Sequence, residues 1–172
     1  MDRQRKMHCR SCPYRSFNYK FMLFSKPRPL LSAAIQEMVV DAIRKAEAGT
    51  TGEIRVFVEQ HCTYVDPLDR AREVFRDLAM EKTERRNAIL VYIALKDHQF
   101  AIFGDEQIYL KAGGPVFWAA AASQLRKYLR EGQTGEGLAA CIEALGSALA
   151  THFPYDPAVP KNELPDEIVF GK

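Results

Sequence analysis

The stretch RNAILVYIALKDHQFAIFGDEQI, residues 86–108, decides the fold of this chain. Its apolar run over residues 88–95 has the length and composition of a strand that is buried on both faces. A short polar reversal follows, and a second apolar run over residues 100–103 predicts an antiparallel partner strand. Acidic residues come directly after Gly104, so carboxylates are expected where the second strand ends.

The elements before this hairpin follow from a second stretch, TTGEIRVFVE, residues 50–59. Alternating apolar residues predict a strand from Ile54 to Glu59. A helix capped by Ser32 precedes that strand, and a second helix begins at Asp66-Pro67, with aspartate at the cap and proline at the first helical position. Two strands joined by a helix should be parallel, with a right-handed crossover.

Two further helices follow the hairpin. Gly113-Gly114-Pro115 opens one, and Thr134 or Glu136 opens the other. The order α-β-α-β-β-α-α predicts an α/β fold, a three-layer α/β/α sandwich around a small mixed β-sheet. Residues 168–170 can add a short edge strand.

Length and composition indicate one globular domain. The chain has 172 residues, of which 47% are hydrophobic. We expect the domain to span residues 30–153, between a disordered basic leader over residues 1–29 and a Pro-rich tail over residues 154–172. The leader carries a formal charge of +7, so the rest of the chain carries −5 against a total of +2. An acidic body argues against a specific nucleic-acid-binding domain.

The leader offers little chemistry. Cys9 and Cys12, beside His8, supply too few ligands for a tetrahedral zinc site. Met22 begins MLFSKPRPLLS, which we interpret as the true start, and residues 1–21 would then be an over-extended gene start. The chain has no signal-peptide core and no apolar run of roughly 18 residues, which predicts no membrane anchor. Four scattered cysteines do not form a disulfide framework, so a cytoplasmic location is expected.

The predicted topology gathers charged residues at the end of the sheet where the two parallel strands begin and the third strand ends. Oxygen ligands suit Ca²⁺ or Mg²⁺, and guanidinium groups can hold a phosphate. The candidate metal ligands are Glu53, Asp105 and Glu106, and the candidate phosphate-binding residues are Arg85, Arg86 and Asn87. The residues alone favour the simpler interpretation that the carboxylates pair with the arginines on a solvated surface.

The opposite edge of the sheet offers an alternative site. It collects His61, Cys62, Asp97 and His98, with Asp66 nearby, at the carboxyl ends of the parallel strands. Such a set can bind zinc or perform thiol chemistry. The competing interpretation is structural, because Asp66 caps a helix, His98 lies in a turn and Cys62 has no activator nearby in sequence.

Three blocks together resemble the TPM domain family, which is named partly after a thylakoid lumen protein and is described as phosphatase-like. They are TTGEIRVFVE, LDRAREVFRDLAMEKTERRNAILVYIALKDHQFAIFGDEQI and GGPVFWAAAASQLRKYLREGQTGEGLAACIEALGSALATHFPY. The resemblance covers about residues 32–155, and the closing NELPDEIVFG also looks like the end of short bacterial members. It implies an α/β/α sandwich, divalent-metal binding and a weak phosphatase activity.

The family's recurrent positions match Gly52-Glu53, Asn87 and Gly104-Asp105, all on the first edge. This chain departs from the pattern at Arg86, where longer members often have an aspartate. The function that the resemblance implies is a divalent-metal-binding interaction module, with a protein partner at this edge or at the tail. The alternative is a metal-dependent phosphatase-like hydrolase acting on phosphomonoesters.

Overall fold

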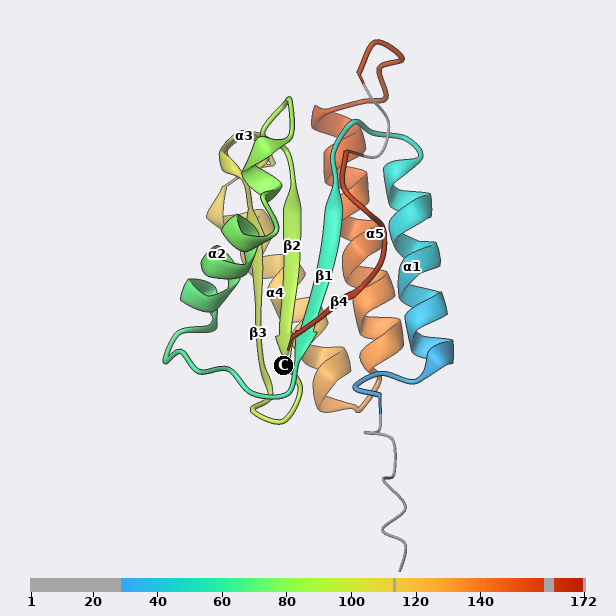
Figure 1. Cartoon of the computed structure of the whole chain (residues 1–172). Coiled ribbons are helices and arrows are strands. Elements are labelled where there is room, and N and C mark those ends of the chain that lie inside the picture. Colours follow the sequence, from blue (N-terminus) through green and yellow to red (C-terminus); the bar gives the residue numbers. More distant parts are fainter. Residues whose placement is uncertain (1–28, 113, 160–162, 172) are drawn as a thin grey trace, which may run out of the picture.

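The computed structural model describes residues 29–112, 114–159 and 163–171 and has the predicted three layers (Figure 1). Most of the leader, with Cys9 and Cys12, lies outside these residues. The elements are α1 (Ala33–Glu47), β1 (Ile54–Glu59), α2 (Pro67–Asp77), the 3-10 helix η1 (Met80–Lys82), β2 (Ile89–Ala94), β3 (Gln99–Gly104), α3 (Glu106–Lys111), α4 (Pro115–Arg130), α5 (Thr134–His152) and β4 (Val169–Phe170).

The strands form one mixed sheet in the order β3-β2-β1-β4. β1 and β2 are parallel, with Ile54 opposite Ile89, and β3 runs antiparallel to β2, with Gly104 opposite Ile89. β4 lies parallel to β1, which confirms the predicted edge strand. The hairpin therefore returns the end of β3 to the level at which β1 and β2 begin.

Strand β2 is buried along its whole length, as its apolar run predicts. Its residues Ile89, Val91 and Ile93 face a core shared with α1, α4 and α5. Leu90 and Tyr92 face a second core, which α2 covers. Alternate side chains thus bind the two helical layers to one central strand.

The helix starts follow the sequence signals. Ser32 Oγ accepts a hydrogen bond from Ile35 N at 3.3 Å, and Asp66 Oδ1 accepts one from Leu68 N at 2.8 Å. The short helix α3 was not predicted. It forms because Asp105 Oδ1 accepts from Glu106 N at 2.7 Å, at the first turn after the hairpin.

The tail packs onto the sheet. Pro154 bridges to Thr50, and Gly171 N donates to Val58 O at 2.9 Å. Between these ends, Leu164 packs against the core on the α2 side of the sheet, and Ile168 belongs to the core on the other side. The tail therefore supplies the fourth strand and covers part of β1.

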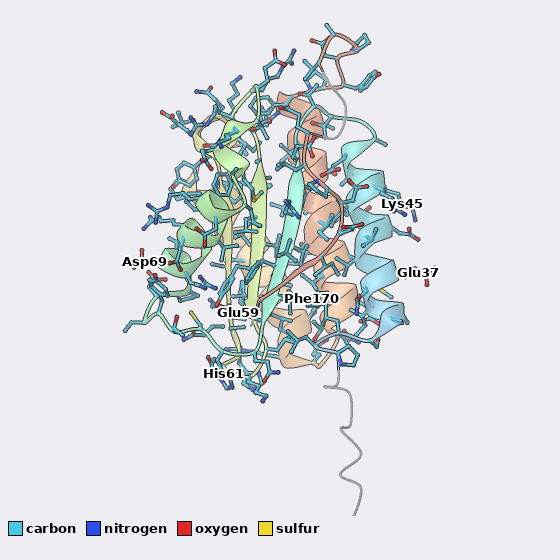
Figure 2. All side chains as sticks on the ribbon, viewed as in Figure 1. Glu37, Lys45, Glu59, His61, Asp69 and Phe170 are labelled. Carbon is cyan, nitrogen blue, oxygen red and sulfur yellow. The ribbon has the colours of Figure 1, made fainter. Side chains whose placement is uncertain are left out.

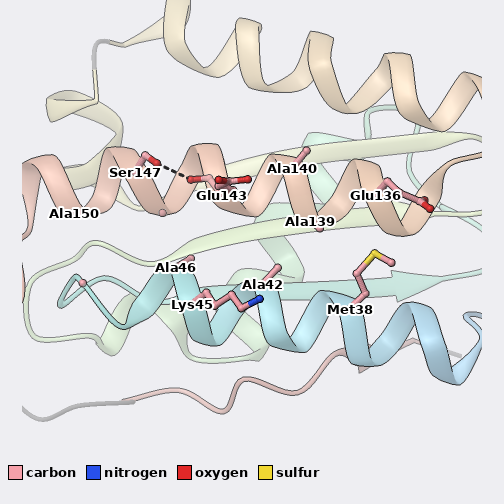
Figure 3. A pocket seen from close by; sticks show the side chains of 12 residues that line it. Met38, Ala42, Lys45, Ala46, Glu136, Ala139, Ala140, Glu143, Ser147 and Ala150 are labelled. Atoms are coloured by element: carbon pink, nitrogen blue, oxygen red, sulfur yellow. Dashed lines mark hydrogen bonds between the residues drawn. The ribbon is translucent and has the colours of Figure 1, made fainter.

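Helices α1 and α5 pack closely against each other in the layer that covers the face of the sheet opposite to α2. Gly146 of α5 lies against Ala46 of α1, and small residues from both helices line a surface groove of about 710 Å³ (Figure 3). α5 has 19 residues, but no described helix is both long and apolar enough to cross a membrane.

The close approach at Gly146 predicts a packing defect. A Cβ atom there would lie 2.5 Å from Ala46 Cβ and 3.0 Å from Ala46 Cα. We expect Gly146→Ala to lower the free energy of unfolding by about 1–2 kcal/mol, because overpacking outweighs the better helix propensity of alanine. Urea unfolding measures this. Gly49→Ala is the control, since a Cβ at Gly49 meets nothing within 4 Å; a stabilised Gly146→Ala would contradict the packing argument.

Candidate functional site

The residues predicted to form the site do meet at one end of the sheet, which we call the rim: Glu53, Arg85, Arg86, Asn87, Asp105 and Glu106. The rim lies at the level where β1 and β2 begin and β3 ends, at the top of Figure 1. Ile89 N donates to Glu53 O at 2.8 Å, and Asp105 N donates to Ala88 O at 2.9 Å. These bonds extend the strand pairing by one residue and place Glu53 and Asp105 on either side of Ala88.

The side chains of the rim do not all lie on one face of the sheet. Glu53 and Asp105 are in phase with the strand residues that face α2, whereas Asn87 is in phase with those that face α5. Glu53 and Asp105 are also separated by β2. Two strand spacings put their backbones about 10 Å apart.

Asp105 is held by Arg86. Arg86 Nε and Nη2 donate to the two carboxylate oxygens of Asp105 at 2.7 and 2.9 Å. Asp105 is only 4% exposed, whereas nearly half of the Arg86 side chain is in contact with solvent. Hydrogen bonding to Asp105 raises the pKa of Arg86 above its usual value. Removing Arg86 would leave the buried Asp105 carboxylate without a charged partner, whereas removing Asp105 would leave a guanidinium that solvent can hydrate.

Glu53 is held by the tail. Its carboxylate accepts hydrogen bonds from Glu163 N at 3.0 Å and from Leu164 N at 3.3 Å. Burial, opposed in part by these bonds, raises the pKa of Glu53 to about 7. Arg85 also contacts the tail through an ion pair with Asp156 at 2.5 Å. Both side chains therefore hold the tail against the body.

Asn87 is fully buried and fixes the loop before β1. Its Nδ2 donates to Thr51 O at 3.1 Å and to Thr51 Oγ1 at 3.4 Å. Its Oδ1 has no hydrogen-bond partner among the described residues. This oxygen is therefore free to accept a hydrogen bond or to bind a cation. It lies, however, on the face of the sheet opposite to Glu53 and Asp105.

The arrangement does not fit one divalent cation. Glu53 and Asp105 are about two strand spacings apart, each already accepts hydrogen bonds from the protein, and Glu106 is exposed at the first position of α3. Within residues 29–112, 114–159 and 163–171, no three His, Cys, Asp or Glu side chains are grouped closely enough to hold a metal. The sequence allowed a second interpretation, in which the carboxylates pair with the arginines. Asp105 follows that interpretation, because it pairs with Arg86.

Glu47, the last residue of α1, is a further rim residue that the sequence did not reveal. Its Oε1 accepts a hydrogen bond at 2.6 Å from the backbone N of Ile54, the first residue of β1. Burial raises the pKa of Glu47 to about 8, and the nearby carboxylates of Glu53 and Asp166 add to this shift. Buried Arg55 is the nearest cationic group on β1, and burial lowers its pKa.

The opposite end of the sheet, which we call the carboxyl edge, also collects the residues predicted for it. His61 Nδ1 lies 2.9 Å from Asp97 Oδ1, and Cys62 N donates to Asp97 Oδ2 at 2.6 Å. The bond to His61 is the main reason that the pKa of Asp97 is below its usual value. His98 sits in the β2–β3 turn with a left-handed φ of 53°. These contacts tie the loop after β1 to the hairpin.

A buried network near this edge was also missed. Glu59 accepts from Tyr92 Oη at 2.5 Å and from Arg70 Nε and Nη2 at 3.1 and 2.9 Å. Glu59 lies near the labelled His61 and Phe170 (Figure 2). Burial raises the pKa of Tyr92 above its usual value. The network fixes α2 to β1 and β2, and both oxygens of its buried carboxylate accept hydrogen bonds from these donors.

The raised pKa of Glu47 predicts how stability depends on pH. Between pH 4.5, the usual pKa of a glutamate, and a pH of about 8, the folded state binds more protons than the unfolded state. The free energy of unfolding should therefore fall as pH rises through this range. Glu47→Gln keeps an oxygen acceptor for Ile54 N and removes the titration. We expect this variant to match the unaltered chain near pH 5 and to be more stable near pH 9 by on the order of 2 kcal/mol.

Urea unfolding at several pH values measures this difference. Exposed Glu143→Gln on α5 is the control and should leave the pH dependence unchanged. An unchanged pH dependence in Glu47→Gln would show that Glu47 is ionised at neutral pH.

Comparison with known proteins agrees with this fold. A sequence model of the TPM domain matches residues 25–148. The chain is similar to BA42 protein from the psychrophilic bacterium Bizionia argentinensis, with 37% identity and a TM-score of 0.76 over 86% of this chain and 99% of BA42. It shares its fold with the N-terminal domain of cg2496 protein from Corynebacterium glutamicum, at 15% identity and a TM-score of 0.53, over 83% of this chain and 95% of that domain.

A comparison with curated proteins finds no match. The TPM domain match nevertheless covers well over half of the chain, and the similarity to BA42 extends over nearly all of that protein. The chain therefore belongs to the TPM domain family.

Proposed function

We propose that this chain is a non-catalytic binding module of the TPM family that recruits a partner protein at the rim. The observation that carries the proposal is the pairing of Arg86 with both oxygens of Asp105. The guanidinium supplies the positive charge that a bound Ca²⁺ or Mg²⁺ would otherwise supply to this carboxylate. Arg86 is a cation fixed to the chain, so the rim keeps its charge balance without a metal.

The surface around the rim supports a protein partner. Tyr109 and Leu110 on α3 and Val116 at the start of α4 are 43%, 66% and 79% exposed. Gln107 N donates to Arg86 O at 3.2 Å, so α3 is fixed directly beside Arg86. Exposed apolar side chains next to a charged group are typical of surfaces that bind other proteins.

The phosphatase alternative finds less support. Metal-dependent hydrolysis of a phosphomonoester requires carboxylates that are free to bind metal, and a group that activates water. Glu53 and Asp105 accept hydrogen bonds from the tail and from Arg86, and the rim contributes no imidazole or thiol. Binding of Ca²⁺ or Mg²⁺ by Glu53, Asp105 and Glu106 stays a prediction. We expect it to be weak, because Arg86 must first leave Asp105.

A metal titration tests the role of Arg86. We expect the amide spectrum of the unaltered chain to show no saturable change at the rim below about 1 mM Ca²⁺, the weak end of protein calcium sites. Arg86→Asp replaces the fixed cation by another carboxylate and should gain saturable Ca²⁺ binding. A Ca²⁺-dependent rise in the melting temperature of this variant would report the same gain.

Lys127→Asp is the control, because it makes the same charge change at an exposed position in the last turn of α4, which makes no ion pair with a described carboxylate. It should not gain Ca²⁺ affinity. Saturable shifts at Glu53 and Asp105 in the unaltered chain would instead establish the predicted metal site and contradict the proposed role of Arg86.

A phosphomonoester assay with Ca²⁺ or Mg²⁺ separates a binding module from an enzyme. We expect no metal-dependent turnover above that of the Glu53→Ala and Asp105→Ala variants. Turnover by the unaltered chain that both substitutions abolish would overturn the non-catalytic proposal, provided that the variants keep the unfolding transition of a folded domain.

A further inference from the structure

A hollow of about 560 Å³ lies at the carboxyl edge, away from the rim. The β2–β3 hairpin forms one wall, and the end of α4 with the start of α5 forms the other. Its apolar lining includes Leu95, Phe100 and Leu129, and its polar lining includes His98, Arg126 and Arg130. The six residues of β2 separate it from the rim by about 20 Å. Open α/β sheets most often bind ligands at this end of their parallel strands.

The cations in this hollow lack acidic partners. Arg126 and Arg130 are one helical turn apart on α4, and neither makes an ion pair with a described residue. No aspartate or glutamate is among the described residues that line the hollow. The Arg126 guanidinium instead lies 5.9 Å from the centre of the Phe100 ring. This contrasts with Arg70, Arg85 and Arg86, which are all paired with carboxylates.

The start of α5 adds backbone donors. Thr134 lines the hollow and begins this helix, and the capping residue Gln133 makes no side-chain hydrogen bond to the first turn. Gly132 precedes it with a left-handed φ of 74°. The first amide groups of a long helix carry partial positive charge and favour an anion. The acidic residue of the first turn, Glu136, lines the α1–α5 groove instead of this hollow (Figure 3).

Gln99 also lines the hollow and adds a neutral polar group. Its Oε1 is buried with no hydrogen-bond partner among the described residues, and an oxyanion, which is itself an acceptor, cannot satisfy this oxygen. Only the amide NH2 group of Gln99 can donate to such a ligand.

We infer that this hollow binds a small organic anion, with an oxyanion group held by Arg126, Arg130 and the start of α5. Guanidinium groups pair with the planar edge of a carboxylate or with a phosphate through two hydrogen bonds. The apolar lining beside Phe100 and Leu129 suits a flat hydrophobic body. The volume lies within the usual range of small-molecule sites. This inference is independent of the function proposed for the rim.

Phenylphosphonate and benzoate are suitable probes, because they present the two oxyanion types on the same ring and neither can be hydrolysed. The full chain is titrated while its amide spectrum is recorded. We expect saturable shifts at Gln99, Gly132 and Thr134 for at least one probe. Binding of only one of them identifies the oxyanion type. Benzyl alcohol, which lacks the charge, and inorganic phosphate, which lacks the ring, should each bind at least about tenfold more weakly.

The double variant Arg126→Gln/Arg130→Gln should weaken binding by about tenfold or more. Lys127→Gln is the control, because it removes a positive charge from the same exposed helix but lies outside the lining of the hollow. Added salt should weaken binding of the anionic probes. Arg86→Ala at the rim should leave probe binding unchanged.

Three results would overturn the inference. They are the absence of saturable shifts with both probes, equal affinity for benzyl alcohol, and an equal loss of affinity in Lys127→Gln and the double arginine variant. Because the probes act far from Arg86, a failure here leaves the rim proposal standing, and a failure at the rim leaves this one standing.

Discussion

Strand β2 must be covered on both faces, and the rest of the structure follows from this requirement. Its side chains are all buried, between α2 on one face and α1, α4 and α5 on the other. The hairpin and β1 pair its two edges, so even its backbone is enclosed. A central strand of this kind leaves little room for chemistry along its length, since an unpaired polar group there is costly. Charged side chains therefore collect at its two ends, where water or neighbouring loops can reach them.

The two ends deal with charge in different ways. At the rim, the carboxylates of Glu53 and Asp105 are buried, so each needs a donor within the protein: Arg86 donates to Asp105, and the tail amides donate to Glu53. At the carboxyl edge, Arg126 and Arg130 are exposed, and solvent hydrates them at little cost while they remain unpaired. The contacts of the buried rim carboxylates thus stabilise the fold, whereas the arginines of the hollow make no ion pair with a described residue. The sequence alone therefore does not reveal whether a given charge is already paired within the protein.

Sequence patterns predicted the strands, the hairpin, the helix starts and the meeting of Glu53 with Asp105 at one edge, because these depend on local periodicity and on the handedness of crossovers. They did not predict α3, whose six residues are too few to show a helical period. They also did not reveal the buried carboxylate of Glu47 or the hydrogen bonds that Glu53 accepts from the tail. The tail that covers Glu53 lies 110 residues away in sequence, and its contact could not be read from local pattern. In the sequence, Arg126 and Arg130 look like ordinary exposed helix residues. Only the fold shows that they lie opposite the β2–β3 hairpin.

The backbone conformation at position 86 does not favour arginine, so the side-chain contacts of Arg86 must explain why arginine occurs there. Its φ of 51° lies in the left-handed region, which costs an ordinary residue roughly 1–2 kcal/mol and which aspartate or asparagine adopts more readily. The resemblance to longer TPM members places an aspartate at this position, so arginine is the less favourable choice for the turn. The two hydrogen bonds to buried Asp105 offset that cost. They give this carboxylate its counter-charge, and no other described cation pairs with it. An aspartate at this position would instead put two carboxylates side by side and would require a bound cation to neutralise them. Arginine instead of aspartate at this position therefore changes the sign of the charge beside Asp105, and the guanidinium supplies the positive charge that a bound cation would otherwise supply.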